Sequence, residues 1–264
     1  MGCVMYRFLL RPRWIVGHLL VIVTVVAFVN LGLWQLRRLE DRQARNALIT
    51  ARLGEPVQPF DTVLTETGGD PEQAQFRRVE ITGTFAAPQL LTAPRSLEGQ
   101  PGHQVLGVLE TRSGPAMLVD RGWIAFDRSA RPPAAPDGPV RISGVLRAAE
   151  PGAPTSSEQV AHIAPDTVAD RLGRALAPVY VQAVEQQAVG GQQSPQVAAL
   201  PPTPLPRLTE GNHRSYAGQW FIFAAIVLIG YPLLVWRTAH RARELRGGRH
   251  TSTMDRPLST TSTS

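Results

Sequence analysis

The sequence has no lysine and a single cysteine, and the shortage of cysteine excludes two kinds of site. Because Cys3 has no second cysteine to pair with, neither an intramolecular disulfide nor a metal centre built from cysteines can form. The 27 basic side chains are all arginines, and they gather beside two apolar blocks and in the C-terminal tail. Nucleic-acid binding would instead need a basic stripe along one face. We therefore expect a lipid bilayer, and no nucleic acid, as the partner of these arginines.

Charged side chains are also missing from residues 14–36 and from the stretch between Arg214 and Arg237. A helix needs roughly 20 apolar residues to cross the hydrocarbon core of a membrane. The first block is longer than the roughly 7 to 15 apolar residues of a cleavable signal peptide, so we expect it to stay attached. The pattern predicts two transmembrane helices, at residues 14–36 and 212–236.

Arginines after the second span predict the orientation of the chain. Five of them follow the span closely: Arg237, Arg241, Arg243, Arg246 and Arg249. The positive-inside rule places the C-terminus in the cytoplasm, and two spans place the N-terminus there as well. We predict a cytoplasmic N-terminus, a first span, an extracytoplasmic domain, a linker rich in Pro and Gln, a second span, and a basic, then Ser/Thr-rich disordered cytoplasmic tail: 1–13, 14–36, 37–185, 186–211, 212–236 and 237–264.

The segment between the spans has the pattern of a β-rich domain. In Phe76–Phe85, Val79 and Ile81 alternate with polar residues, which is the period of a half-buried strand. Similar short runs follow, separated by Pro and Gly: 89–93, 104–111, 116–120, 124–126, 140–147 and 179–184. Many short strands of this kind are typical of an antiparallel sheet forming a sandwich or a partial barrel. The predicted fold class is a membrane protein with two transmembrane α-helices flanking a β-rich, α+β extracytoplasmic domain.

Helical segments are expected at two places outside the spans. Good helix formers continue from the first span to about Leu53, so the first helix should extend past the membrane surface. Residues 55–75 are rich in Pro, Gly, Thr and acids, and their composition predicts a loop. One helix, Asp166–Ala177, should interrupt the strands, with Asp166 as its N-cap.

The start of the second span holds the strongest candidate for a functional site. Four side chains crowd its first two turns: His213, Arg214, Tyr216 and Trp220. Neutral imidazole is a good axial ligand for haem iron, so His213 is a candidate metal ligand. Arginines here and at the end of the first span, Arg37 and Arg38, suit propionate carboxylates, and the two aromatic rings suit the walls of a pocket. The alternative is that these residues are ordinary anchors at the membrane interface.

Other polar positions carry weaker signals. His18 lies inside the first span, where a polar residue is either functional or close enough to the end to reach water. His103 and His162 fall in predicted loops or strand edges without ligand-like spacing. The run Asp120–Trp123 follows an apolar strand, and we interpret it as a structural corner in which Gly122 permits a bulge or turn. The sequence has no zinc, calcium, P-loop or nucleophile motif, so we expect no enzymatic activity.

Six motifs, taken in order, resemble one protein family. They are LGLWQLRR at the end of the first span, then FRRVEITGTF, MLVDRGWIAF, RISGVLR and PVYVQA, and finally NHRSYAGQWF at the start of the second span. Together, from residue 31 to about 236, they resemble the Surfeit locus protein one (Surf-one, or SURF1) family of cytochrome c oxidase assembly factors. Gly211 departs from the pattern, because the family often has an asparagine there.

The resemblance implies a non-enzymatic chaperone of the bacterial plasma membrane, a multi-pass protein that assists delivery or insertion of haem a into subunit I of haem-copper cytochrome c oxidase. Haem a would be held transiently, and subunit I and haem a synthase would be partners. The histidine and tryptophan of the family motif map to His213 and Trp220. The alternative is a cofactor-free scaffold that stabilises oxidase subunit intermediates. The two functions differ at one residue, because only haem handling requires His213.

Overall fold

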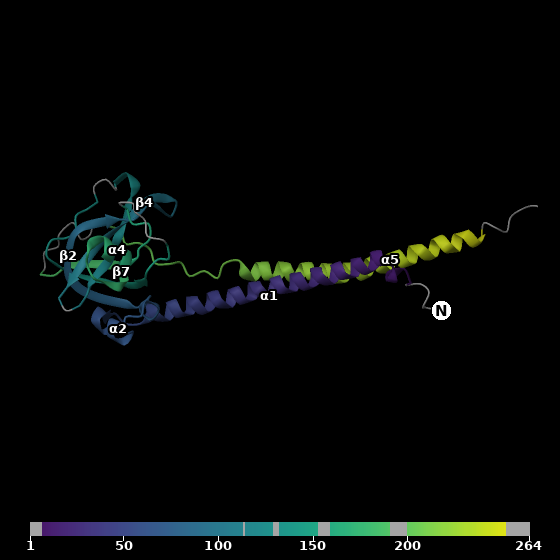
Figure 1. The fold of residues 1–264 in the computed structure, drawn as a ribbon, viewed down its shortest axis with the longest axis horizontal. Coiled ribbons are helices and arrows are strands. Elements are labelled where there is room, and N and C mark those ends of the chain that lie inside the picture. The colour runs from purple at the N-terminus through teal and green to yellow at the C-terminus, as the bar shows by residue number, and fades with distance from the viewer. Residues whose placement is uncertain (1–6, 113, 129–131, 153–158, 191–199, 252–264) are drawn as a thin grey trace, which may run out of the picture. The chain divides into compact units, whose positions relative to one another are not determined.

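The computed structural model describes residues 7–112, 114–128, 132–152, 159–190 and 200–251. The chain forms two compact units, one made of residues 1–45 with 209–264 and the other of residues 46–208. The first unit is helical and the second contains the sheet (Figure 1). The two apolar ends of the sequence therefore belong to one unit, and the β-rich centre forms the other.

Two long helices make up the helical unit, and residues 46–54 at the end of the first of them belong to the sheet unit. α1 (Pro12–Gly54) begins after a short 3-10 turn at Arg7–Leu10, and α5 (His213–Thr251) is its partner. Both helices are long and apolar enough to cross a membrane, and most of their large apolar side chains are exposed. The prediction that the first helix continues past residue 36 is confirmed, because α1 runs unbroken to Gly54.

α1 and α5 are antiparallel neighbours that approach closely at Gly32 (Figure 1). A Cβ atom on Gly32 would lie 2.7 Å from the ring of Phe221, so this ring packs directly on the α1 backbone. On α5, Ala217 and Ala224 are 2% and 7% exposed. Small residues allow transmembrane helices to approach in this way. The close contact between the helices therefore requires glycine at residue 32.

The sheet unit is a closed barrel. Its seven strands follow the order β1-β2-β6-β7-β5-β4-β3, and an additional β2–β4 pairing closes the ring β2-β6-β7-β5-β4. The bounds of the strands are β1 (Gln58–Pro59), β2 (Arg78–Leu91), β3 (Arg95–Leu97), β4 (Gln100–Thr111), β5 (Ala116–Ala125), β6 (Pro139–Ala148) and β7 (Leu176–Ala188). Of the two predicted forms, a sandwich or a partial barrel, the structure is nearer the second, because the strands close into a complete ring.

The expectation of a purely antiparallel sheet was wrong, because β5 pairs with β7 in parallel, as does β1 with β2. The reason is geometric. Strand direction must return to itself after one circuit of a ring, so a ring contains an even number of antiparallel pairings. In the ring of five strands, four pairings are antiparallel and the fifth, β5–β7, is parallel.

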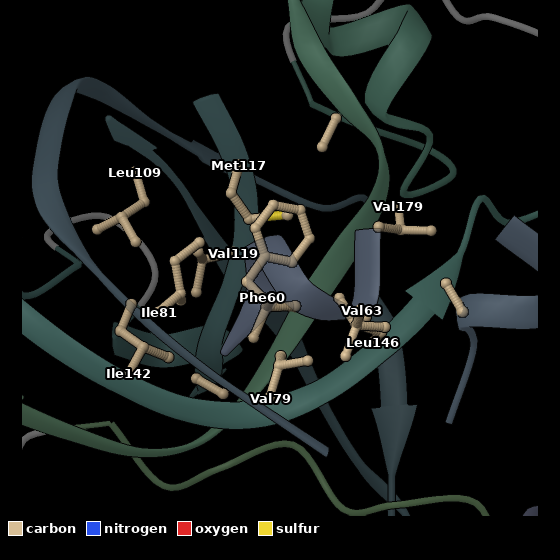
Figure 2. Packing of buried hydrophobic residues seen from close by; sticks show 14 of the residues in the cluster. Phe60, Val63, Val79, Ile81, Leu109, Met117, Val119, Ile142, Leu146 and Val179 are labelled. Atoms are coloured by element: carbon tan, nitrogen blue, oxygen red, sulfur yellow. The ribbon is translucent and has the colours of Figure 1, made fainter. Parts of the chain in front are cut away.

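Apolar side chains from every strand of the ring fill the barrel (Figure 2). Two residues of α2 (Phe60–Glu66), Phe60 and Val63, lie among them and are 2% and 0% exposed. The prediction of a loop at residues 55–75 was therefore wrong, since this stretch holds α2 and α3 (Pro71–Ala74). Its Pro and Gly residues obscured a short apolar face that is stable only because the barrel buries it.

A second apolar cluster covers the outside of β4, β5 and β7, where α4 (Pro165–Leu172) packs through Val168. The prediction of Asp166 as N-cap was wrong, because Ala164 occupies that position and Pro165 takes the first turn. The carboxylate of Asp166 instead accepts a hydrogen bond from the Thr167 amide at 2.7 Å. The helix ends at Leu172, before the predicted limit, because Gly173 adopts a left-handed conformation with φ of 62°.

Candidate functional site

His213 is the first residue of α5, and its side chain is half-buried against α1. Its ring atom Nδ1 lies 2.9 Å from Oε1 of Gln35, a residue of the first helix. The helical period places His213 on the same side of α5 as Ala217, Ala224 and Tyr231. This side faces α1, as the burial of the two alanines shows. The candidate ligand is thus held where the two helices meet.

The other ring nitrogen of His213, Nε2, lies beside the backbone that leads into α5. Gly211 adopts a left-handed conformation with φ of 68°, and a Cβ atom there would lie 3.6 Å from Nε2. Glycine adopts such a conformation without strain. The turn before the helix therefore leaves the Nε2 edge of the imidazole free of a neighbouring Cβ.

Trp220 lies on the same side of α5, two turns further along the helix. Its ring packs against Phe28 of α1 and Phe223 of α5, at centroid distances of 5.6 and 6.0 Å. Seven residues separate it from His213, which corresponds to about 10 Å along the axis. The two residues therefore do not contact each other. Trp220 belongs to an aromatic cluster deeper in the helix pair.

Arg214 and Tyr216 do not share the His213 face. Arg214 is exposed and follows His213 by one residue, or about 100° around the helix. The side chain of Tyr216 is 48% exposed. On α1, the guanidinium of Arg38 lies 5.8 Å from the ring centre of Trp34. The structure thus brings His213 to α1 and leaves Arg214 and Tyr216 at the exposed surface, while Trp220 packs in the aromatic cluster between the helices.

Gln35 was not among the residues predicted for the site, although it stands inside the LGLWQLRR motif. In the sequence, Gln35 is a single amide side chain at the end of an apolar block, which does not by itself indicate a site. It also lies 178 positions from His213. A second polar pair joins the same helices at their other end. The hydroxyl of Tyr231 lies 2.6 Å from Nδ1 of His18, so the polar residue noted in the first span has its partner on α5.

No group of three or more His, Cys, Asp or Glu side chains suitable for a metal ion occurs in the part of the chain that the structure describes. A single imidazole cannot hold a bare ion as a closed protein site would. It can serve as one axial ligand of an iron that a macrocycle already holds. The donor set at the start of α5 therefore fits haem better than a free metal ion.

Comparison with known families decides the identity of the chain. The family model described as the SURF1 family matches residues 22–225. The chain belongs to the SURF1 family. It is 30% identical over 253 residues to an uncharacterized SURF1-like protein of Mycobacterium tuberculosis, covering 91% of this chain and 90% of that protein. SURF1-like proteins of Dictyostelium discoideum and Rickettsia felis are 31% and 27% identical over 110 and 111 residues, covering 39% and 41% of this chain and 40% and 46% of theirs.

The range matched by the SURF1 model includes one of the two polar helix contacts and omits the other. Gln35 and His213 both lie inside residues 22–225, whereas His18 and Tyr231 both lie outside. The matched range also includes Trp220 and the whole barrel. The contact at the start of α5 is thus the one that belongs to the shared SURF1 region.

A second polar cluster of the SURF1 chain lies in the barrel, at the bulge predicted for Gly122. The β4–β5 register shifts there, and Gly122 has φ of 138°. Asp120 and Arg121 are each 1% exposed and have separate partners. The Arg121 guanidinium donates to Oε1 of Gln89 and lies 5.2 Å over the ring of Phe85. These contacts make the cluster a structural corner.

Residues at and beside the same corner bind the segment at residues 200–203, which follows the barrel in the sequence. The Trp123 amide donates to the Pro201 carbonyl at 2.8 Å, and the amide group of Gln182 donates to the Thr203 carbonyl at 2.6 Å. Leu200 packs against the barrel and is 8% exposed. Part of the stretch predicted as a linker is therefore bound to the barrel surface.

The histidine of β4 is part of the core and has no place in a ligand site. The prediction that His103 lies in a loop or at a strand edge was wrong, since it is inside β4 and 1% exposed. Its Nδ1 lies 2.6 Å from the Thr92 carbonyl oxygen, and its ring stacks on Phe126 at 5.5 Å. A buried histidine with a backbone partner is satisfied where it is.

Asp120 should make the stability of the barrel depend on pH. Burial raises the pKa of its carboxyl group from 3.8 to about 6. The folded state therefore binds this proton more tightly than the unfolded state, so the contribution of Asp120 to stability is greatest below pH 4 and falls as pH rises to about 6. At about 1.4 kcal/mol for each tenfold change in proton affinity, the loss is about 3 kcal/mol.

Urea unfolding between pH 4 and 7 tests this prediction. The difference between wild type and Asp120→Asn isolates this carboxyl group from others such as Glu150, whose pKa is lowered by its bond to Arg95 despite burial. We expect wild type to lose stability relative to Asp120→Asn as pH rises through this window. Parallel curves for the two proteins would show that Asp120 has the same proton affinity folded and unfolded.

Proposed function

We propose that this SURF1 protein is a membrane-bound assembly factor of haem-copper cytochrome c oxidase that holds haem a at His213 while the haem passes to subunit I. Family membership supports the role in oxidase assembly. The observation that supports haem handling is the half-buried imidazole of His213, which faces α1 with one nitrogen engaged and the other free of a neighbouring Cβ. Haem a is cargo in this proposal, and its chemistry is unchanged by the protein.

The proposed setting is the bacterial plasma membrane. α1 and α5 are the two spans, both termini are cytoplasmic, and the barrel is extracytoplasmic. The five arginines after residue 236 support this orientation through the positive-inside rule. The start of α5 would then lie at the outer interface, where an apolar bed for a macrocycle meets water for its propionates. Subunit I and haem a synthase are the proposed partners.

Each residue of the site has a definable task in this function. The Nε2 atom of His213 would ligate the iron. The aromatic cluster around Trp220 would contact the apolar ring, and exposed guanidinium groups such as that of Arg214 would pair with propionates. One protein ligand and solvent-exposed ion pairs make a weak site, and a chaperone must release its cargo. We propose no catalytic step for this protein.

The absorption spectrum of the detergent-purified protein, produced together with haem a synthesis, tests the proposal. We expect wild type to retain haem a and His213→Ala to lose it. His240→Ala is the matched control, because His240 is another α5 imidazole, with its ring centre 4.5 Å from that of Trp236, near the opposite end of the apolar stretch. This control should retain haem. If wild type carries no haem while deletion of the protein still impairs oxidase maturation, the cofactor-free scaffold is correct.

A further inference from the structure

We propose that Gln35 is a positioning residue for the His213 imidazole, an inference that rests on the proposed function. Gln35 fixes the tautomer and the orientation of the ring, so that Nε2 presents its lone pair to haem iron. The contact that carries this inference is the 2.9 Å distance between Oε1 of Gln35 and Nδ1 of His213. A neutral imidazole has one N–H and one lone pair. If Nδ1–H donates to the amide oxygen of Gln35, the lone pair is on Nε2.

The surroundings of His213 agree with this assignment. Metal-ligating histidines almost always donate their second ring N–H to a carboxylate, carbonyl or water, which sets the tautomer and the ring orientation. Gln35 supplies such an acceptor from the opposite helix. On the other side of the ring, a Cβ at Gly211 would lie 3.6 Å from Nε2, an ordinary van der Waals contact, so the glycine leaves that nitrogen without a side-chain neighbour from residue 211.

Gln35 is itself held in place by the packing of the helix pair. It is half-buried and stands three residues after Gly32, on whose backbone the Phe221 ring packs. At the other end of the pair, the hydroxyl of Tyr231 lies 2.6 Å from Nδ1 of His18. These fixed points set the register of α1 against α5. An error of one residue would move the Gln35 amide by about 1.5 Å along the axis and by 100° around it.

The His18–Tyr231 contact separates a ligand-positioning role from simple bracing of the helices. Both contacts join an imidazole Nδ1 to a side-chain oxygen on the other helix. Only the Gln35 contact lies at the proposed haem end. Tyr231→Phe removes a brace of the same kind and leaves His213 untouched, so it is the matched control for Gln35→Leu.

The first readout needs no haem. Nitrogen-15 NMR of the histidine rings, with His213 assigned by comparison with His213→Ala, reports which ring nitrogen carries the proton. We expect the proton on Nδ1 in wild type and in Gln35→Glu, because a carboxylate only accepts, and no confinement to Nδ1 in Gln35→Leu. A wild-type proton on Nε2 would overturn the inference, since Gln35 would then donate its amide N–H to Nδ1.

The second readout is the affinity and reduction potential of bound haem a. We expect Gln35→Leu to weaken binding about 10-fold or more, as loss of such a partner typically does. Gln35→Glu should keep the haem and lower its reduction potential, because a carboxylate makes the imidazole a stronger donor. Tyr231→Phe should change neither. Equal weakening by Gln35→Leu and Tyr231→Phe would reduce Gln35 to a brace. Haem retention by His213→Ala would instead refute the proposed function and leave the NMR result standing.

Discussion

Replacing Gly122 by alanine should destabilise the barrel by about 3 kcal/mol or more. The new Cβ would lie 2.4 Å from the Pro201 carbonyl oxygen and 3.1 Å from Cβ of Leu200. The residue would also have to keep φ at 138°, which L side chains rarely adopt. Backbone strain and overpacking each cost about 1–3 kcal/mol. Relief would require the bulge in β5 to shift or the segment after residue 200 to detach.

Gly138→Ala is the matched control for this prediction. Its φ of 80° is also left-handed, but a Cβ there meets nothing within 4 Å. Gly138→Ala should therefore lower the stability of the barrel through backbone strain alone, by about 1–2 kcal/mol. Trypsin cleaves after arginine, and the sequence holds 27 of them. The temperature at which the barrel becomes susceptible to trypsin therefore compares the stability of wild type and both variants. Equal effects of the two substitutions would show that the segment at Pro201 can move away from β5 without loss of stability.

Gly32→Ile should separate α1 from α5 and, on the proposed function, strongly reduce retention of haem a. The Cβ alone would meet the Phe221 ring at 2.7 Å, and the branched side chain adds further bulk. Since close helix approach in membranes depends on small residues, the helices must move apart or rotate. Gln35 is only one turn further along α1, so its contact with His213 should be lost too. We expect at least a tenfold drop in bound haem.

Ala27→Ile is the control, because Ala27 is on the same helix but exposed. Spin labels on cysteines introduced at residues 30 and 219, both exposed, would report the separation of the helices in a Cys3→Ser background. Gly32→Ile should lengthen or broaden the distance distribution, and Ala27→Ile should not. An unchanged distance together with lost haem would show that residue 32 acts on the haem itself rather than through helix packing.

Patterns within a short stretch of sequence were reliable guides. The absence of charge from residues 14–36 and after Arg214 predicted two long apolar helices, because length and hydropathy are local properties. Alternation in Phe76–Phe85 predicted a strand, and the structure has one there, β2, which begins at Arg78 and continues to Leu91. Gly122 predicted a bulge or a turn, and a bulge is present. His213 was selected by residue type and place alone, and it does open α5.

Local patterns failed where burial by distant residues decides the outcome. Phe60 and Val63 form a helix because the barrel covers them, and their Pro- and Gly-rich surroundings concealed this. The N-cap expected at Asp166 was an error of another kind, because the local signal of Pro165, which suits the first turn of a helix, places the cap at Ala164. His103 is buried because it belongs to β4, whose start the sequence did not mark.

The sequence by itself determined the apolar helices, a β-rich centre, and a histidine at the start of the second apolar helix. The tertiary structure alone decided that β2 and β4 close a ring, that β5 and β7 run in parallel, and that Gln35 meets His213 across 178 positions. The physical reason is range. Hydropathy and periodicity act between neighbours in the chain, whereas ring closure and side-chain pairing depend on where distant segments pack.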